Sequence, residues 1–349
     1  MTLFPIPHSV GTNMNASALH LDRRRLLRLL GFALAGGLPT LASASTPDEK
    51  YPTKGVRIIN PYPAGSPIDA VGRYAAEALQ KATGQSFVVE SVTGAGGTIG
   101  VAAAVRAPAD GYTLLAQTTG ALVCGPMLYK SAGYDVLRDL KPVWGLRSAG
   151  LVLVVPPNSP FKTLEDLVTQ ARKAPGKLSF ATAGNGSPQH MAAELLSNAT
   201  GIKLMNVPYR GAVPSQVALM GAEVDMLFDS IAGALPQIAG GKFRALAVLR
   251  KSRLDALPDV PTMQEAGFAA VQMPPSAIGL FVRQPVAEAD MERLATLLSK
   301  AYAADTQVQA RLKNLGLSDI TAGAPFAAQV RDEAAFYKQL IQTSNITVG

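Results

Sequence analysis

The residues best suited to chemistry lie in two short Ser-Pro segments, each of which follows a strand-like run and opens a helix-like one. The first runs from Pro63 to Asp69. Within it, Ser66 is a natural helix cap, Pro67 suits the first helical position, and Asp69 completes the spacing of a capping box. A helix start at the carboxyl end of a strand presents free backbone N–H groups, which bind anions. The segment therefore predicts an anion site formed by Ala64, Gly65, Ser66 and Asp69.

The second segment repeats this arrangement, because a strand-like run leads into Asn185, Ser187, Pro188 and His190. Each helix start favours an anion by about 0.3 to 1 kcal/mol when exposed and by up to about 2 kcal/mol when partly buried. One such start is a common structural device, but two that meet at one solute would hold a carboxylate without a buried arginine. Asn185, Ser187 and His190 therefore join the candidate ligand-binding residues.

Three further places carry weaker candidates. Tyr209, Arg210 and Gly211 follow a strand-like run and precede a helix-like one, where Arg210 would give charge-assisted hydrogen bonds. The alternative is that Tyr209 is a packed aromatic residue and Arg210 a solvated surface charge. Asp229 either contacts the ligand or caps the next helix. Thr118, close behind a strand-like run, completes the candidate set.

The same residues make a poor active site. Ser187 and His190 have the types of a nucleophile and its base, so an exported hydrolase is an alternative. The chain has no G-x-S-x-G elbow, however, and a capping Ser187 spends its oxygen on backbone N–H groups. His190 is the only histidine after residue 44, and the single cysteine, Cys124, is expected to be a small buried residue. We therefore expect no catalysis, no disulfide within the chain and no metal site.

A glycine-rich turn from Gly94 to Gly100 also fails as a cofactor site. The third glycine of a G-x-G-x-x-G fingerprint would fall on Ile99, and no acidic residue ends a second strand at the required distance. We interpret the segment as a tight turn that permits close backbone approach, and we expect no cofactor.

The amino-terminal segment indicates export. Its arginines precede an apolar run over residues 29–41, which ends at Ala42-Ser43-Ala44. This is the pattern of a secretory signal peptide, and the run is too short to span a membrane. The arginines, at 23, 24, 25 and 28, match the twin-arginine pattern, although an arginine-rich general secretory signal fits as well. We assign residues 1–44 to a leader cleaved near Ala44, with Met14 as an alternative start, and expect a periplasmic protein.

The chain of 349 residues is 48% hydrophobic and long enough for about two domains. Without the leader its net charge falls from +7 to +4, and its basic residues are scattered, so we expect no nucleic-acid partner. Strand-like runs alternate with helix-like ones, which is typical of α/β folds with parallel sheets. The predicted strands are 56–60, 87–90, 112–116, 152–155, 178–182, 204–207, 224–228, 245–249 and 277–282, and the clearest helices are 67–81, 164–173, 188–200, 288–304 and 325–342.

A strand-rich break in this alternation falls around 144–155 and a second break around 271–281, where the chain is expected to cross between two lobes. The first lobe then consists of residues 45–148 and 272–349, and the second of residues 149–271. Small ligands prefer the interfaces between domains. The layout therefore predicts two α/β lobes with a ligand cleft between them.

Many short motifs in this order resemble the receptor family of tripartite tricarboxylate transporters, the Bug proteins. They cover nearly the whole chain after the leader and comprise 62–69 with Arg73, 88–90 with Gly94 to Gly97, 110–115, Tyr134-Asp135, Asp139-Leu140, 182–190, 207–211 and 258–262. The resemblance implies a type II periplasmic binding fold that closes on a carboxylate held by backbone N–H groups and bridging waters. It implies a monomer that delivers a small organic acid to the membrane subunits of such a transporter.

The sequence departs from the family at two places. Ser66, Pro67 and Ile68 stand where two glycines and a threonine are usual, and Ser91 and Val92 replace an asparagine and an arginine. Pro67 lacks an N–H donor and Ile68 adds apolar bulk, so the hypothesis is a solute less polar than citrate, such as a nicotinate-like monocarboxylate. A sensor that docks on a signalling partner would share this fold and ligand, so transport and sensing both stay open.

Overall fold

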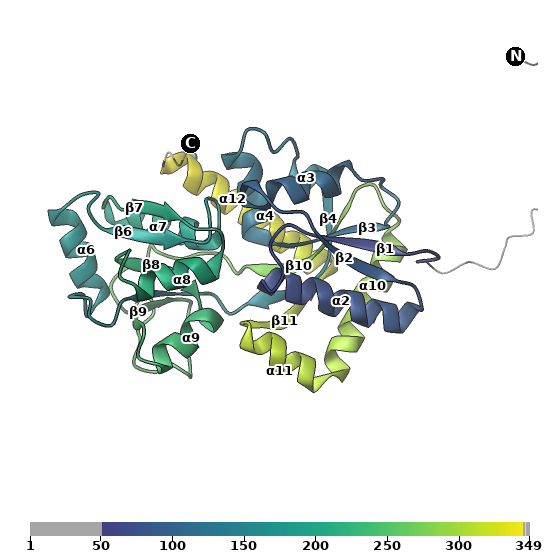
Figure 1. The fold of residues 1–349 in the computed structure, drawn as a ribbon. Coiled ribbons are helices and arrows are strands. Elements are labelled where there is room, and N and C mark those ends of the chain that lie inside the picture. Colours follow the sequence, from purple (N-terminus) through teal and green to yellow (C-terminus); the bar gives the residue numbers. More distant parts are fainter. Residues whose placement is uncertain (1–50, 345, 347–349) are drawn as a thin grey trace, which may run out of the picture. The chain divides into compact units, whose positions relative to one another are not determined.

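The computed structural model describes residues 51–344 and 346, and the predicted leader lies outside them. Two sheets carry different stretches of this part of the chain, as the colours of Figure 1 show. The first sheet has the order β11-β4-β10-β3-β1-β2 and the second the order β7-β6-β8-β5-β9.

The strands of the first sheet come from both ends of the described chain. They are β1 (Val56–Asn60), β2 (Phe87–Ser91), β3 (Thr113–Thr118), β4 (Leu140–Ser148), β10 (Ala277–Arg283) and β11 (Leu317–Ala322). The accompanying helices are α2 (Pro67–Thr83), the 3-10 turn η1 (Ala95–Gly97), α3 (Thr98–Arg106), α4 (Thr119–Leu128), α5 (Val136–Asp139), α10 (Glu288–Ala304), α11 (Thr306–Asn314) and α12 (Gly323–Thr343).

The second sheet is built from the middle of the chain. Its strands are β5 (Leu151–Val155), β6 (Ser179–Thr182), β7 (Met205–Pro208), β8 (Met226–Ser230) and β9 (Arg244–Leu249). Its helices are α6 (Leu164–Lys173), α7 (Pro188–Thr200), α8 (Ala212–Met220) and α9 (Ile231–Ala239). Each strand and helix named in the sequence prediction is present, with ends that differ by a few residues at most.

Both sheets follow one plan. In each, three strands pair in parallel (β2, β1 and β3; β7, β6 and β8), and the next strand runs antiparallel to them. That antiparallel strand is β10 in the first sheet and β5 in the second, and in each case the chain has just arrived from the other sheet. The predicted parallel pairing therefore holds only for part of each sheet, because a strand that enters from the other lobe runs in the opposite direction.

The sequence prediction missed β4 and β11. Pro142 and Gly145 lie inside β4, and both residue types argue against a strand. The ladder accommodates Pro142 at an irregularity, because the register of β10 against β4 shifts between Leu280 and Phe281, and Phe281 pairs with Pro142. Gly145 is required by packing, since a methyl group there would lie 2.9 Å from the Ile278 carbonyl oxygen.

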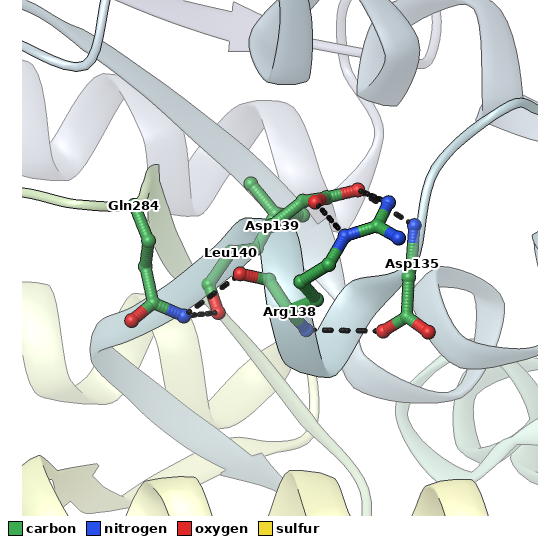
Figure 2. A network of polar contacts seen from close by, with 5 residues as sticks. All are labelled: Asp135, Arg138, Asp139, Leu140 and Gln284. Atoms are coloured by element: carbon green, nitrogen blue, oxygen red, sulfur yellow. Dashed lines mark hydrogen bonds and ion pairs between the residues drawn. The ribbon is translucent and has the colours of Figure 1, made fainter.

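The motif formed by Asp135 and Asp139 has a structural role (Figure 2). Asp135 caps α5 by accepting the Arg138 N–H at 3.0 Å, and its own N–H donates to Asp139 Oδ2 at 2.8 Å. Arg138 pairs with Asp139 at 2.6 Å, and Gln284 donates to the Leu140 carbonyl at 2.9 Å. The network joins the beginning of β4 to the end of β10. This motif therefore holds these two strand ends of the first sheet together.

The two passages of the chain between the sheets lie side by side. Only Ala149 and Gly150 separate β4 from β5, and the return passage enters β10 directly after Ser276. The Ser148 N–H donates to the Ser276 carbonyl at 2.8 Å, which ties the two passages together. The predicted lobe boundaries, 148/149 and 271/272, agree with the division of strands between the sheets but stay a prediction.

Candidate functional site

The first predicted helix start is present, with one correction to its capping. Ser66 Oγ accepts the Asp69 N–H at 3.1 Å, and Pro67 is the first residue of α2. Asp69 Oδ2 accepts the Gly65 N–H at 2.9 Å, whereas the predicted capping box required the Ser66 N–H. The reason is that the loop turns the Ser66 N–H toward the Pro63 carbonyl oxygen, 3.4 Å away.

Asp69 organises the loop that precedes α2. Its carboxylate also accepts Asn60 Nδ2 at 3.1 Å and Arg73 Nε at 2.8 Å, while Asn60 Oδ1 accepts the Tyr62 N–H at 3.1 Å. Burial alone would raise the pKa of Asp69, but the hydrogen bonds from Arg73, Gly65 and Asn60 outweigh it and lower that pKa. Asp69 is therefore an ionised anchor of the loop, and its oxygens are engaged within the protein.

The same hydrogen bonds show which donors of this helix start remain unused. Within the described residues, the N–H groups of Ala64 and Ile68 have no hydrogen-bond partner, whereas those of Tyr62, Gly65 and Ser66 are engaged. Ala64 is exposed, but Ile68, the second residue of α2, has its side chain buried in the hydrophobic core of the first sheet. Ile68 therefore adds no apolar bulk to the candidate site.

The second helix start uses its serine in the same way. Ser187 Oγ accepts the His190 N–H at 3.3 Å, and His190 Nδ1 accepts the Gly186 N–H at 3.1 Å. An accepting Nδ1 places the proton of a neutral imidazole on Nε2, which lies 3.6 Å from Glu194 Oε1. Both ring nitrogens of His190 are thus directed away from the Ser187 hydroxyl, so this pair lacks the geometry of a nucleophile and its base.

Asn185 and Gln189 supply the unused donors of the second helix start. Within the described residues neither N–H has a partner, while Asn185 Oδ1 accepts Asn206 Nδ2 at 2.8 Å. Pro188 has no N–H, and the N–H of Ser187 donates to the Gly184 carbonyl at 3.1 Å. Each helix start therefore keeps two backbone donors.

Two tyrosine hydroxyls and a glycine connect the surroundings of the two helix starts. Tyr62 Oη donates to the Gly96 carbonyl at 3.1 Å, and Tyr129 Oη donates to the Asn185 carbonyl at 3.4 Å. A methyl group on Gly96 would lie 3.2 Å from the same Asn185 oxygen. Gly96 has a φ of 63°, so the predicted tight turn with close backbone approach is confirmed. These groups link the loop that carries Ser66 to the loop that carries Ser187, and that the two serines face one another stays a prediction.

A third helix start, that of α4, lies beside the second. A methyl group on Gly120 would lie 3.6 Å from Pro188 Cγ and 3.2 Å from the Tyr337 hydroxyl. Thr118 Oγ1 is buried without a hydrogen-bond partner, and the N–H groups of Thr119 and Gly120 have none within the described residues. Thr118 is thus the predicted residue with the clearest unused polar atom.

Tyr209, Arg210 and Gly211 lie next to the second helix start. The Tyr209 N–H donates to the Thr182 carbonyl at 2.9 Å, and its hydroxyl lies 3.4 Å from Glu223. Arg210 is exposed, and no ion pair or hydrogen bond of its side chain occurs within the described residues. Gly211 precedes α8 with a φ of 114°. Arg210 therefore supplies a cation close to the second helix start that stays unpaired in the described structure.

Asp229 is buried rather than presented at a surface. Its oxygens accept Gln216 Nε2 at 2.6 Å and the Ser230 N–H at 2.8 Å. Burial raises the pKa of Asp229 to about 6, against the opposing effect of these two hydrogen bonds. The alternative that Asp229 caps α9 is wrong, because Ser230 does so by accepting the Gly233 N–H at 3.1 Å.

Sequence reasoning missed Tyr129 and Gln117 and gave Tyr62 no role of its own. A methyl group on Gly97 would lie 3.1 Å from Gln117 Nε2 and 3.3 Å from the Tyr62 ring, so these side chains surround the glycine turn. The signal for Gln117 was available, because it is a polar residue within the apolar run of β3. Nothing in the local sequence separates Tyr129 from an ordinary packed aromatic residue.

The remaining expectations concern single residues and whole classes of site. Cys124 is fully buried, as predicted, and burial raises the pKa of its thiol. Within residues 51–344 and 346, no cluster of His, Cys, Asp and Glu side chains has a metal-binding arrangement. In the same part of the chain, no helix combines the length and apolar character needed to cross a bilayer.

Two sheets of matching strand order, joined by paired crossings and with helix starts that keep free donors, define the two-lobed solute-binding receptor class. The sequence model of one protein family, the tripartite tricarboxylate transporter family receptor, matches residues 71–346. The chain therefore belongs to this receptor family, as the resemblance of its motifs indicated.

Known relatives agree with that assignment. Protein BugT of Bordetella pertussis is 37% identical over 250 residues, which cover 71% of this chain and 76% of BugT. The R. palustris protein Rpa4515, solved with adipate, is 28% identical with a TM-score of 0.76 over 85% of this chain and 99% of its own. MatC of Rhodopseudomonas palustris, solved with bound malate, is 28% identical with a TM-score of 0.73 over 83% of this chain and all of MatC (100%).

Proposed function

We propose that this protein is exported to the periplasm, binds a small carboxylate-bearing solute between its lobes, and delivers it to the membrane subunits of a tripartite transporter. The observation that carries the proposal is the set of unused N–H donors at helix starts of both sheets. Ala64 and Ile68 provide them in the first, and Asn185 and Gln189 in the second. Oriented N–H groups at helix starts favour anions, and a carboxylate offers four acceptor positions.

The chemistry of the relatives supports the same class of solute. Rpa4515 was solved with adipate and MatC with malate, and both are small carboxylates. Arg210, exposed beside the second helix start, is a candidate to pair with a carboxylate once a solute is bound. The polar atoms of Asp69 and His190 are engaged within the protein, so their proposed role is to position the donors.

The polarity of the solute is a separate question. The hypothesis of a monocarboxylate drew on Pro67 and Ile68, but Ile68 is buried in the core. It now depends on Pro67 alone, which removes one N–H donor from the helix start.

A thermal-shift panel tests both the class and the polarity of the solute. The protein is heated with adipate, malate, citrate, nicotinate and, as a neutral control, nicotinamide. A bound carboxylate at about 100 times its Kd stabilises the folded state by about 2.7 kcal/mol, so at least one acid should raise the Tm in a concentration-dependent way. Nicotinamide should leave the Tm unchanged. Stabilisation by the amide alone would contradict carboxylate capture, and stabilisation by citrate but not nicotinate would contradict the monocarboxylate hypothesis.

Sensing is a second candidate that uses the same site. Adjacent genes for large and small membrane subunits would support transport, and an adjacent histidine kinase gene would support sensing. The hydrolase alternative is not supported, because the Ser187 hydroxyl caps α7 and His190 bonds to Gly186 and faces Glu194.

A further inference from the structure

The return passage between the sheets is held by a buried polar cluster of side chains that lies behind the start of α4. The cluster consists of Thr119 at the start of α4 and Gln329 and Glu333 on α12, and α12 packs directly against α4. Glu333 has 0% exposure. Within the described residues no basic side chain forms an ion pair with it.

The contacts of the cluster meet on one short segment of backbone. Gln329 Nε2 donates both to the Pro275 carbonyl at 3.0 Å and to Glu333 Oε1 at 3.2 Å. Thr119 Oγ1 accepts the Ala277 N–H at 3.0 Å and lies 3.1 Å from Ser276 Oγ. The segment from Pro275 to Ala277, which leads the chain back into the first sheet, is therefore hydrogen-bonded by Gln329 and Thr119. Both of these side chains lie beside the Glu333 carboxyl group.

This segment is also bonded to the first passage, because the Ser276 carbonyl accepts the Ser148 N–H. We propose that Glu333 is a positioning residue for both passages between the lobes, acting through Gln329 and Thr119 on the segment from Pro275 to Ala277. The inference adds to the proposed function, in which these passages are where the lobes would bend.

The charge state of Glu333 decides how well it fills this role. Burial raises the pKa of Glu333 to about 8, although the nearby Thr119 hydroxyl and the Gln329 amide lower it in part. The other titratable groups facing the carboxyl are the thiol of Cys124 on α4 and the phenol of Tyr337 on α12, and burial raises the pKa of both. Burial therefore favours the uncharged form of all three groups. A neutral carboxyl carries one O–H donor, and the buried Gln329 Oε1 and Tyr337 Oη are both without a partner within the described residues.

Ionisation of Glu333 places an unpaired charge in this cluster, so the protein should lose stability as the pH rises. Because the pKa is raised from 4.5 in the unfolded chain to about 8, the contribution is complete below about pH 4.5 and is lost progressively up to about pH 8. Asp229 acts in the same direction below about pH 6, so only a comparison with a Glu333 variant isolates the effect.

The test compares the wild type with Glu333→Gln, which stays neutral and keeps a donor, and with Glu333→Ala, which removes both. Asp332→Asn is the matched control, because Asp332 is the exposed neighbour on the same helix. Urea unfolding is followed between about pH 5 and pH 9, together with hydrogen exchange of the peptide 271–282, and no solute is needed. Failure of this inference is therefore distinct from failure of the proposed function.

The expected result is that Glu333→Gln is increasingly stable relative to the wild type as the pH rises. The ratio of their folding equilibrium constants should change by up to about tenfold per pH unit between about pH 5 and pH 8 and then level off. The Ala277 amide should exchange faster in the wild type than in Glu333→Gln at the alkaline end, and fastest in Glu333→Ala at every pH. Asp332→Asn should follow the wild type.

Equal pH profiles for the wild type and Glu333→Gln would overturn the inference, and so would exchange that changes elsewhere but not in the peptide 271–282. If Glu333→Gln does not fold, carbon-13 NMR of glutamate carboxyls in the wild type decides the matter. A Glu333 carboxyl that titrates near its ordinary value overturns the inference, and one that titrates well above it supports the inference.

Discussion

Tyr62 and Tyr129 show how much of the candidate site depends on single side chains. Each hydroxyl reaches a backbone carbonyl, of Gly96 and of Asn185, and so holds a loop that carries a helix start. Burial and the neighbouring Tyr129 raise the pKa of Tyr62 to about 12, while the nearby Gln117 amide acts in the opposite direction. Burial also raises the pKa of Tyr129. Both phenols therefore keep their protons, and remain donors, across the physiological range.

Gly96 provides the sharpest residue-scale prediction. In Gly96→Ala the new methyl group lies 3.2 Å from the Asn185 oxygen and 3.1 Å from the Tyr129 hydroxyl, so it should separate the two loops. We expect at least a tenfold rise in the Kd of the acid that stabilises the wild type most, measured by calorimetry, because about 1.4 kcal/mol corresponds to a factor of ten.

Gly241→Ala is the matched control for that substitution. Gly241 has a φ of 68°, close to the 63° of Gly96, but no atom lies within 4 Å of a methyl group there. Both variants should lose about 1 to 2 kcal/mol of stability from the left-handed backbone. Equal Kd values in the two variants would mean that the contact between Gly96 and Asn185 does not shape the solute site.

At the scale of elements, the loop before α2 depends on the Asp69 carboxylate. Asp69→Asn weakens the acceptor for the Gly65 N–H, Asn60 and Arg73, so the free energy of unfolding should fall by about 1 to 3 kcal/mol in urea titrations at neutral pH. Glu77→Gln is the control, because Glu77 lies exposed on the same helix.

The pH dependence of this loss follows from the lowered pKa of Asp69. The stabilisation is present above the unfolded pKa of 3.8 and is lost as the pH falls through the lower folded pKa. The wild type and Asp69→Asn should therefore converge in acid. A difference between them that stays constant into strong acid would contradict an ionised anchor.

The elements also show where the sequence was informative. Ser-Pro starts, capping residues and apolar periodicity predicted α2, α6 and α7 well, because these signals are local. The strand β4 was missed because its Pro142 and Gly145 are tolerated only through a bulge and a close approach to β10, which depend on residues more than 130 positions away. The link from Asn185 to Tyr129 and the grip of Glu333 on the return passage are likewise tertiary, and no short motif announces them.

At the scale of the whole molecule, the two sheets share one hydrophobic cluster. It includes Leu115 from the first sheet, Leu153 and Phe180 from the second, and residues of α4, α7 and α12 such as Met191 and Tyr337. Paired passages and a shared cluster imply that the lobes unfold together, although proteins of two domains often unfold in separate steps.

Trp144 makes this cooperativity measurable, because it is the only tryptophan of the chain and is fully buried in the first sheet. Leu153→Ala empties part of the cluster in the second sheet, which should cost about 2 to 5 kcal/mol. We expect the urea midpoint seen by Trp144 fluorescence to fall as far as the midpoint seen by circular dichroism. Val213→Ala, at a 69% exposed position of α8, should move neither midpoint. If the Trp144 transition stays at the same urea concentration in Leu153→Ala while circular dichroism shows two steps, each lobe is stable by itself. The shared cluster would then position the lobes relative to each other and would not be needed to keep them folded.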